Sequence, residues 1–114
     1  MIRCNGKLIS EKERYCKNIF SQAHGLMFRS RQNLVMVFPT ERKISLHMWF
    51  VFFPIDVLVV DASMKIVEIK KNFKPWTLWK SSVRGKYVIE LAIQGKYEIG
   101  EKIKIIKSSS QGTF

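Results

Sequence analysis

The apolar stretch from Ile44 to Asp61, ISLHMWFVFFPIDVLVVD, constrains the fold of this chain more than any other feature. Between Leu46 and Val60, only one His, one Pro and one Asp interrupt the apolar side chains. A membrane-spanning helix needs about 20 apolar residues, so this stretch is too short and too interrupted for one. Its Val, Ile, Phe and Trp content is typical of buried β-strands. We expect two buried strands, bent near Pro54, with core contacts from Trp49, Phe50, Phe52, Val57 and Val59.

The segment before this stretch predicts a short strand and then a helix. Residues 2–8 alternate weakly and suit a strand. Ser10 has the features of a helix N-cap, and Glu13 completes a capping box three residues later. Tyr15 and the apolar residues four and eight positions beyond it form one face of a helix over about Ser10–His24.

The rest of the chain predicts short strands joined by turns. We expect strands at Leu34–Phe38, Lys65–Lys71, Tyr87–Ile93 and Lys102–Ile105, a turn at Asp61–Met64, and a long loop over Lys70–Lys86. This pattern predicts a mainly β (α+β) fold, a compact antiparallel β-barrel or jelly-roll-like single domain with one N-terminal helix. The domain is expected to span residues 1–107, with a flexible polar tail at 108–114.

The charge of the chain favours an anionic partner. The 114 residues contain 20 Lys and Arg against 9 Asp and Glu, a net charge of +11. Such a charge suits nucleic acid, an anionic membrane surface or a phosphorylated ligand, although it also serves solubility alone. The two cysteines, Cys4 and Cys16, are not spaced for a zinc site and are expected to be free thiols. The absence of a signal-peptide segment and of a transmembrane segment predicts a cytoplasmic protein, with a monomer favoured.

Several blocks of the sequence resemble one known family. They are Gly25-Leu26-Met27-Phe28-Arg29, Met36–Pro39, His47-Met48 with Phe53–Val57, Val67–Ile69, Lys74–Leu78 with Ser81-Ser82, Tyr87–Leu91, and Gly100-Glu101. In this order they resemble the prokaryotic family called domain of unknown function 192, or uncharacterised protein family 0127. The chain departs from the family in having Trp49-Phe50-Val51 where relatives often have Lys-Asn-Thr. The resemblance implies a compact, mainly β, barrel-like or jelly-roll-like fold, and no established activity, substrate or cofactor.

The segment from Lys70 to Tyr87 is the strongest candidate for a functional surface. Six cations lie in it among four aromatic residues, and no acid lies between Glu68 and Glu90. Cations beside aromatic faces suit a single-stranded nucleic acid, because phosphates pair with Lys or Arg while bases stack. The alternative is that the Trp side chains close one end of the barrel and the lysines are solvated. The candidate binding residues are Lys70, Lys71, Lys74, Trp76, Trp79, Lys80, Ser81, Arg84, Lys86 and Arg29.

Three functions remain open from the sequence. The first is a non-catalytic binding module for RNA or another anionic ligand. The second is an enzyme acting on a small substrate at the barrel mouth through Asp56, His47 and Arg29, although each of the three also suits a structural role. The third is a protein-interaction or assembly factor. We favour the first, with no catalytic residues, no metal and no cofactor, because only two histidines are present and no catalytic spacing is recognised.

Overall fold

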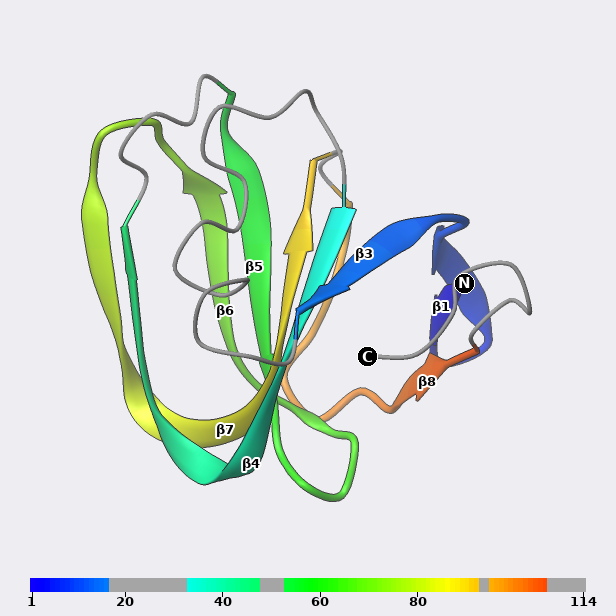
Figure 1. Cartoon of the computed structure of the whole chain (residues 1–114). Helices are drawn as coiled ribbons and strands as arrows, with labels where there is room; N and C mark the ends of the chain where they lie inside the picture. Colours follow the sequence, from blue (N-terminus) through cyan, green and yellow to red (C-terminus); the bar gives the residue numbers. More distant parts are fainter. Residues whose placement is uncertain (17–32, 48–52, 93–94, 107–114) are drawn as a thin grey trace.

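The structure is a computed structural model, and it describes residues 1–16, 33–47, 53–92 and 95–106. The described residues form eight strands in two sheets and no helix (Figure 1). The strands are β1 (Ile2–Cys4), β2 (Lys7–Ser10), β3 (Glu13–Cys16), β4 (Asn33–His47), β5 (Ile55–Val60), β6 (Ile66–Phe73), β7 (Leu78–Leu91) and β8 (Ile103–Ile105). The five-stranded sheet has the order β3-β4-β7-β5-β6, and the three-stranded sheet has the order β2-β1-β8.

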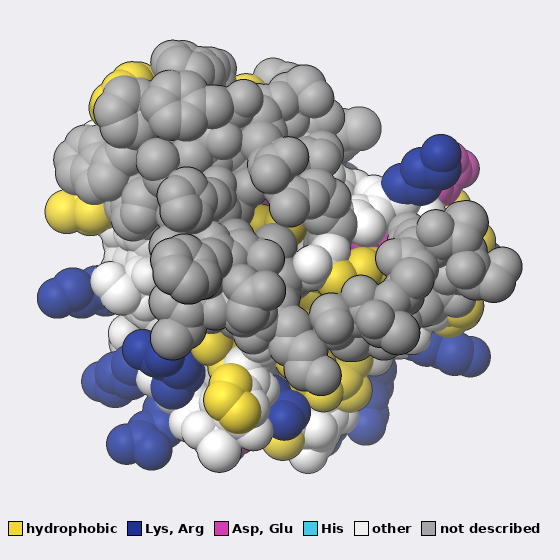
Figure 2. Space-filling model, viewed as in Figure 1, with side chains coloured by type: hydrophobic (Ala, Val, Ile, Leu, Met, Phe, Trp, Pro, Cys, Tyr) yellow, Lys and Arg dark blue, Asp and Glu magenta, His cyan; other side chains and the backbone are white. Residues whose placement is uncertain are grey.

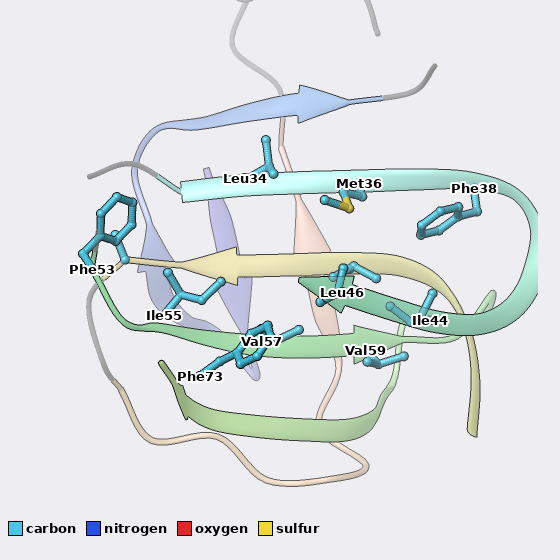
Figure 3. Close-up of a cluster of buried hydrophobic side chains, with 12 residues drawn as sticks. Leu34, Met36, Phe38, Ile44, Leu46, Phe53, Ile55, Val57, Val59 and Phe73 are labelled. Atoms are coloured by element: carbon cyan, nitrogen blue, oxygen red, sulfur yellow. The ribbon is translucent and has the colours of Figure 1, made fainter. Parts of the chain in front are cut away.

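The five-stranded sheet folds over on itself because its two longest strands, β4 and β7, bend together (Figure 1). The first part of β4 pairs with the last part of β7, and the last part of β4 pairs with the first part of β7. β5 then pairs antiparallel with the last part of β7 and with β6. Only β3 runs parallel to its neighbour, β4. The fold encloses a first hydrophobic core, which includes Leu34, Ile44, Leu46, Val57 and Phe73 (Figure 3).

The three-stranded sheet covers the other face of the larger sheet and encloses a second core. Ile2, Cys4 and Ile103 from the smaller sheet pack there against Leu58 and Ile89 of the larger one. Since β5 lies between the two cores, all six of its residues are buried. A strand buried on both faces has a continuous apolar sequence, as Ile55–Val60 has around Asp56.

Irregular pairing produces the bend in β4 and β7. Four residues of β4, numbers 38–41, lie opposite the single residue Lys86 of β7. Further along, residues 81–83 of β7 lie opposite the single residue Ile44 of β4. Extra residues on one strand bend it and increase its twist, so these two bulges turn the pair of strands.

The expected mainly β single domain is confirmed, but the closed barrel is wrong. β3 and β6 are the two edges of the five-stranded sheet, and they are not hydrogen-bonded to each other. The sheet is therefore bent without being closed, and the second sheet covers it from outside.

The helix expected at Ser10–His24 is wrong in the part that the structure describes. Ser10 ends β2, and Glu13 begins β3. The two residues of the expected capping box do meet, since Ser10 Oγ lies 2.7 Å from Glu13 Oε1. They join the turn between two strands and do not cap a helix. The rest of the expected helix, residues 17–24, lies outside the described residues, as do Trp49, Phe50, Phe52 and the tail 108–114.

The long loop expected over Lys70–Lys86 is also wrong. β6 continues to Phe73 and β7 begins at Leu78, so only residues 74–77 form a turn. The bulge and the bend interrupt the alternation of β7, which hides the strand from a search for period-two patterns. By contrast, the expected turn at Asp61–Met64 is confirmed, since the Met64 backbone nitrogen donates to the Asp61 carbonyl oxygen at 3.0 Å. The expected burial of Val57 and Val59 is confirmed as well.

Two further expectations concern the thiols and the membrane. Cys4 is a free, buried thiol, and burial raises its pKa to about 11, with its hydrogen bond to Glu101 adding to the effect. Within the described ranges, no helix has the length and apolar character needed to cross a membrane.

Candidate anion-binding face

The first part of β7 and the last part of β4 form a two-stranded arm at one side of the molecule. Leu46 pairs with Trp79, and both side chains point into the first core. The alternation of a strand then directs Lys43, Ser45 and Lys80 to the outer face of the arm, where they are exposed. The arm is therefore apolar on its inner face and basic on its outer face.

Three cations of the outer face, Lys43, Lys80 and Arg84, define what we call the basic face. Lys43 lies directly opposite Arg84 in the β4–β7 pairing, and Lys80 lies opposite Ser45. No carboxylate of the described residues forms an ion pair with any of the three. Like charges placed opposite each other on two strands destabilise a sheet. Lys and Arg side chains gather at the lower left of Figure 2, over the bend of β4 and β7.

The turn that leads into the arm exposes two large apolar side chains. Trp76 is 47% exposed and Leu78 is 67% exposed. Trp76 has a φ of 64°, a left-handed conformation that is uncommon for a bulky residue. Thr77 Oγ1 donates to the Lys74 carbonyl oxygen at 2.6 Å and fixes the turn. Strained backbone of this kind is found most often at functional sites.

Two side chains satisfy the backbone of β7 where it bulges beneath the basic face. Ser81 is buried; its Oγ accepts from the Ile44 backbone nitrogen at 2.8 Å and donates to the Val83 carbonyl oxygen at 2.8 Å. Glu68 Oε1 accepts from the backbone nitrogens of Ser82 and Val83, at 2.8 Å and 3.2 Å. The bulge is therefore a fixed feature that holds Lys80 and Arg84 in position on either side of it.

The residues predicted from the sequence as one binding loop do not all lie on one surface. Lys80 and Arg84 lie on the basic face. Lys74 is exposed in the turn before the arm, and Lys70 is half-buried on β6. Ser81 is buried beneath the face. Arg29 lies outside the described residues.

Two other predicted cations are engaged elsewhere. Lys71 pairs with Asp56 at 2.8 Å. Lys86 Nζ lies 3.3 Å from the Pro39 carbonyl oxygen and 5.9 Å from the centre of the Tyr87 ring.

The two tryptophans of the predicted segment differ in burial. The alternative interpretation of the sequence placed the Trp side chains at one end of a barrel, and both were also candidate binding residues. Trp79 is half-buried against the first core, with its ring edge-on to Phe73 at 6.4 Å between centres. Trp76, at 47% exposed, is therefore the more exposed of the two.

Asp56 is a structural carboxylate. It is fully buried, and its two oxygens accept from Lys71 Nζ at 2.8 Å, from the Asn72 backbone nitrogen at 3.0 Å and from the Gly95 backbone nitrogen at 3.2 Å. Lys71 Nζ also donates to the Gly95 carbonyl oxygen. A buried carboxylate with this many donors is satisfied where it stands. His47 ends β4.

Glu90 is a buried acid that the sequence reasoning missed. It lies on β7 opposite Leu34 and Val57, on the face of the first core. Its side chain is 5% exposed, and its Oε2 has no hydrogen-bond partner among the described residues. Burial raises the pKa of Glu90 to about 8. The sequence signal was that Glu90 alternates with Val88 and Ala92, which places all three on one face of the strand.

The chain is similar to a family of uncharacterised proteins. The model of the DUF192 family, described as uncharacterised ACR, matches residues 5–104. A UPF0127 protein of Pyrococcus horikoshii is 35% identical over 98 residues, which cover 80% of this chain and 84% of that protein. A UPF0127 protein of Thermococcus sibiricus is 30% identical over 95 residues, covering 80% of this chain and 61% of that protein.

Solved structures share the fold at lower sequence identity. A protein of unknown function from Novosphingobium aromaticivorans superposes with a TM-score of 0.73 at 19% identity, over 82% of this chain and 74% of that chain. A putative transcription regulator from Sinorhizobium meliloti superposes with a TM-score of 0.71 at 19% identity, over 81% of this chain and 79% of that chain. The family match extends over nearly the whole described fold, and the chain belongs to the uncharacterised DUF192 (UPF0127) family.

Proposed function

We propose that this protein is a non-catalytic binding module for a polyanion, with single-stranded RNA as the ligand, and that the basic face is its binding surface. The observation that carries the proposal is the cross-strand pair Lys43 and Arg84, two exposed cations opposite each other. Such a pair costs stability in the free protein, and a bound phosphate would remove the repulsion. The outer face of the arm is therefore better suited to a polyanion than to solvent.

The geometry of the arm also suits an extended strand of nucleotides. A two-stranded ribbon presents cations in a row, as a phosphate backbone requires, and the exposed ring of Trp76 lies in the turn that leads into the same arm. Aromatic rings beside a basic surface stack on bases and tolerate any sequence. We therefore expect binding with little preference for base sequence and with a strong dependence on salt.

The proposal is tested by a salt titration of binding to a fluorescently labelled single-stranded RNA. In the face variant, Lys43, Lys80 and Arg84 are all changed to Gln. Each phosphate contact that is lost should reduce the slope of log affinity against log salt by about 0.7, so the face variant should lose about 2 in slope. The control variant changes Lys7, Lys102 and Lys104 to Gln, which are exposed cations on or beside the smaller sheet. It has the same net charge as the face variant.

Equal slopes for the two variants would overturn the proposal, and so would the absence of RNA binding at low salt. A loss of binding caused by unfolding is distinguishable, because removing the Lys43–Arg84 repulsion should leave the stability of the face variant equal to or above that of the wild type. Two single variants, Trp76→Ala and Trp76→Phe, provide a second test of the proposal. The Ala variant loses the ring and should lose about 1–3 kcal/mol of binding free energy. The Phe variant keeps an aromatic ring and should keep most of that binding free energy.

A further inference from the structure

A separate pocket of about 530 Å³ lies between the two sheets. It is lined by residues 7–12, by Asn33 at the start of β4, and by residues 95–97. The volume lies within the range of pockets that hold small molecules. None of the lining residues belongs to the basic face.

The polar floor of the pocket is fixed by hydrogen bonds to several elements. Asn33 Nδ2 donates to Ser10 Oγ at 2.8 Å, and Asn33 Oδ1 accepts from the Ala92 backbone nitrogen at 2.9 Å. Ser10 Oγ also lies 2.7 Å from Glu13 Oε1, and the Ser10 side chain is buried. A floor that is already held in place need not be ordered when a ligand binds, which lowers the entropic cost of binding.

The ring of Tyr97 forms one wall of the pocket, and Lys71 helps to hold it in place. The ammonium group of Lys71 lies 5.0 Å from the centre of the Tyr97 ring, and Lys71 is itself paired with the buried Asp56. The Gly95 backbone nitrogen bonds the same carboxylate at 3.2 Å. Burial raises the pKa of Tyr97 to about 12, with the charges of Asp56 and Cys4 adding to the effect. The phenol keeps its proton at neutral pH, as an unperturbed tyrosine also does, so its hydroxyl can donate a hydrogen bond.

The walls combine apolar surface with positive charge. Leu8, Ile9 and the Tyr97 ring supply the apolar surface, and Leu8 is 39% exposed. Lys7, Lys12 and Lys96 supply three exposed ammonium groups against the single carboxylate of Glu11. No ion pair joins any of these lysines to a carboxylate in the described part of the chain. The pocket thus presents net positive charge beside an aromatic wall.

We infer that this pocket binds a small anionic molecule in which a phosphate or carboxylate group is joined to a planar apolar ring. The ring lies against Tyr97 and Leu8, and the anionic group is placed among the lysines. The lysines neutralise the anionic group, while the apolar walls remove the ring from water. This inference does not depend on the proposed RNA-binding function, because the two sites share no residue.

The probes for the test are 2-naphthyl phosphate, 2-naphthoate and the neutral 2-naphthylmethanol, titrated against the full chain by calorimetry. We expect one saturable site for at least one anionic probe, with the neutral probe bound at least tenfold more weakly. The better of the two anionic probes identifies whether the natural ligand is a phosphate or a carboxylate. Equal affinity for the neutral and anionic probes, or no saturable binding of either anion, would overturn the inference.

Variants locate the probe on the molecule. Lys96→Glu should weaken the anionic probe at least tenfold, whereas Lys104→Glu makes the same change of charge on β8, outside the pocket, and should leave the affinity within twofold. Tyr97→Phe preserves the ring and removes the phenol donor, so it should weaken the anion more than the neutral probe. Equal effects of Lys96→Glu and Lys104→Glu would place the probe elsewhere. Loss of probe binding in the face variant, in which Lys43, Lys80 and Arg84 are changed to Gln, would likewise overturn the inference.

Discussion

Gly85 of β7 packs so closely on Val59 of β5 that a methyl group on Gly85 would overlap the Val59 side chain and lie 3.3 Å from the Val60 carbonyl oxygen. Gly85 is buried at the bend of β7, where the strand leaves the arm and enters the sheet beside β5. The closeness of these two strands therefore depends on the absence of a side chain at position 85.

Gly85→Ala should destabilise the protein, because the added methyl group forces either β7 or Val59 to move. Overpacking of a filled core costs about 1–3 kcal/mol. Urea unfolding of the variant measures the cost. In the matched control, Val59→Ala is combined with Gly85→Ala, and the double variant should lose less stability than the sum of the two single losses. Losses that simply add would show that the two residues do not compete for space.

Glu90 should make stability depend on pH. The folded chain keeps the Glu90 proton up to about pH 8, whereas the unfolded side chain releases it near pH 4.5. The folded state therefore holds one more proton between these values, and the free energy of unfolding falls as the pH rises from 4.5 towards 8. We expect the wild type to lose about 2–5 kcal/mol across this range relative to Glu90→Gln. Parallel pH profiles of urea unfolding for the two proteins would contradict this.

Leu58 and Leu78 form a matched pair for testing the second core. Leu58 is fully buried, and Leu78 is 67% exposed in the arm. Leu58→Ala leaves a cavity in the core and should lower the free energy of unfolding by about 2–5 kcal/mol. Leu78→Ala should change stability by less than about 0.5 kcal/mol. Chemical unfolding of both variants decides whether the second core is packed as described.

Glu68 should stabilise the bulge of β7. Its carboxylate accepts from the backbone nitrogens of Ser82 and Val83 and from the Ser82 hydroxyl at 3.1 Å. Glu68→Ala leaves these donors to solvent and should cost about 0.5–1.5 kcal/mol. Glu68→Gln retains an acceptor oxygen and should recover part of the loss. Equal stability of all three proteins in thermal unfolding would mean that the bulge does not need the carboxylate.

The sequence predicts the elements whose patterns are local. The apolar residues around Asp56 indicate β5 because a strand covered on both faces needs no polar alternation. Asn5-Gly6 also carries a local signal, for a tight turn. Both residues have positive φ, 49° and 82°, and Asn-Gly is a frequent sequence for the two-residue turn of a β-hairpin. The expected single strand over residues 2–8 is therefore two strands, β1 and β2.

The sequence identifies Lys80 and Arg84 as candidate binding residues, but the layout of the basic face and of the pocket depends on residues that are distant in the chain. Lys43 lies opposite Arg84 only after β4 and β7 have paired across a bulge, which shifts the register. The helix expected at Ser10 failed for a related reason. The Ser10 and Glu13 spacing fits a capping box, but pairing of β3 with β4 outweighs the local preference. The burial of Glu90 depends likewise on partners from two other strands.

The pairing of Ile2 with Ile105 affects the order of folding during synthesis, because it joins two strands that are made at different times. β1 precedes every other strand of the described fold, but its neighbour β8 is made only after every strand of the larger sheet. The larger sheet can close its own core before then, because its last strand ends at Leu91. Closing a loop between such distant segments is slow, so we expect the side of the larger sheet that faces β1 to stay exposed to water until β8 has been synthesised. A nascent chain stalled before residue 103 would then expose Leu58 and Ile89 to chaperones, which bind such surfaces.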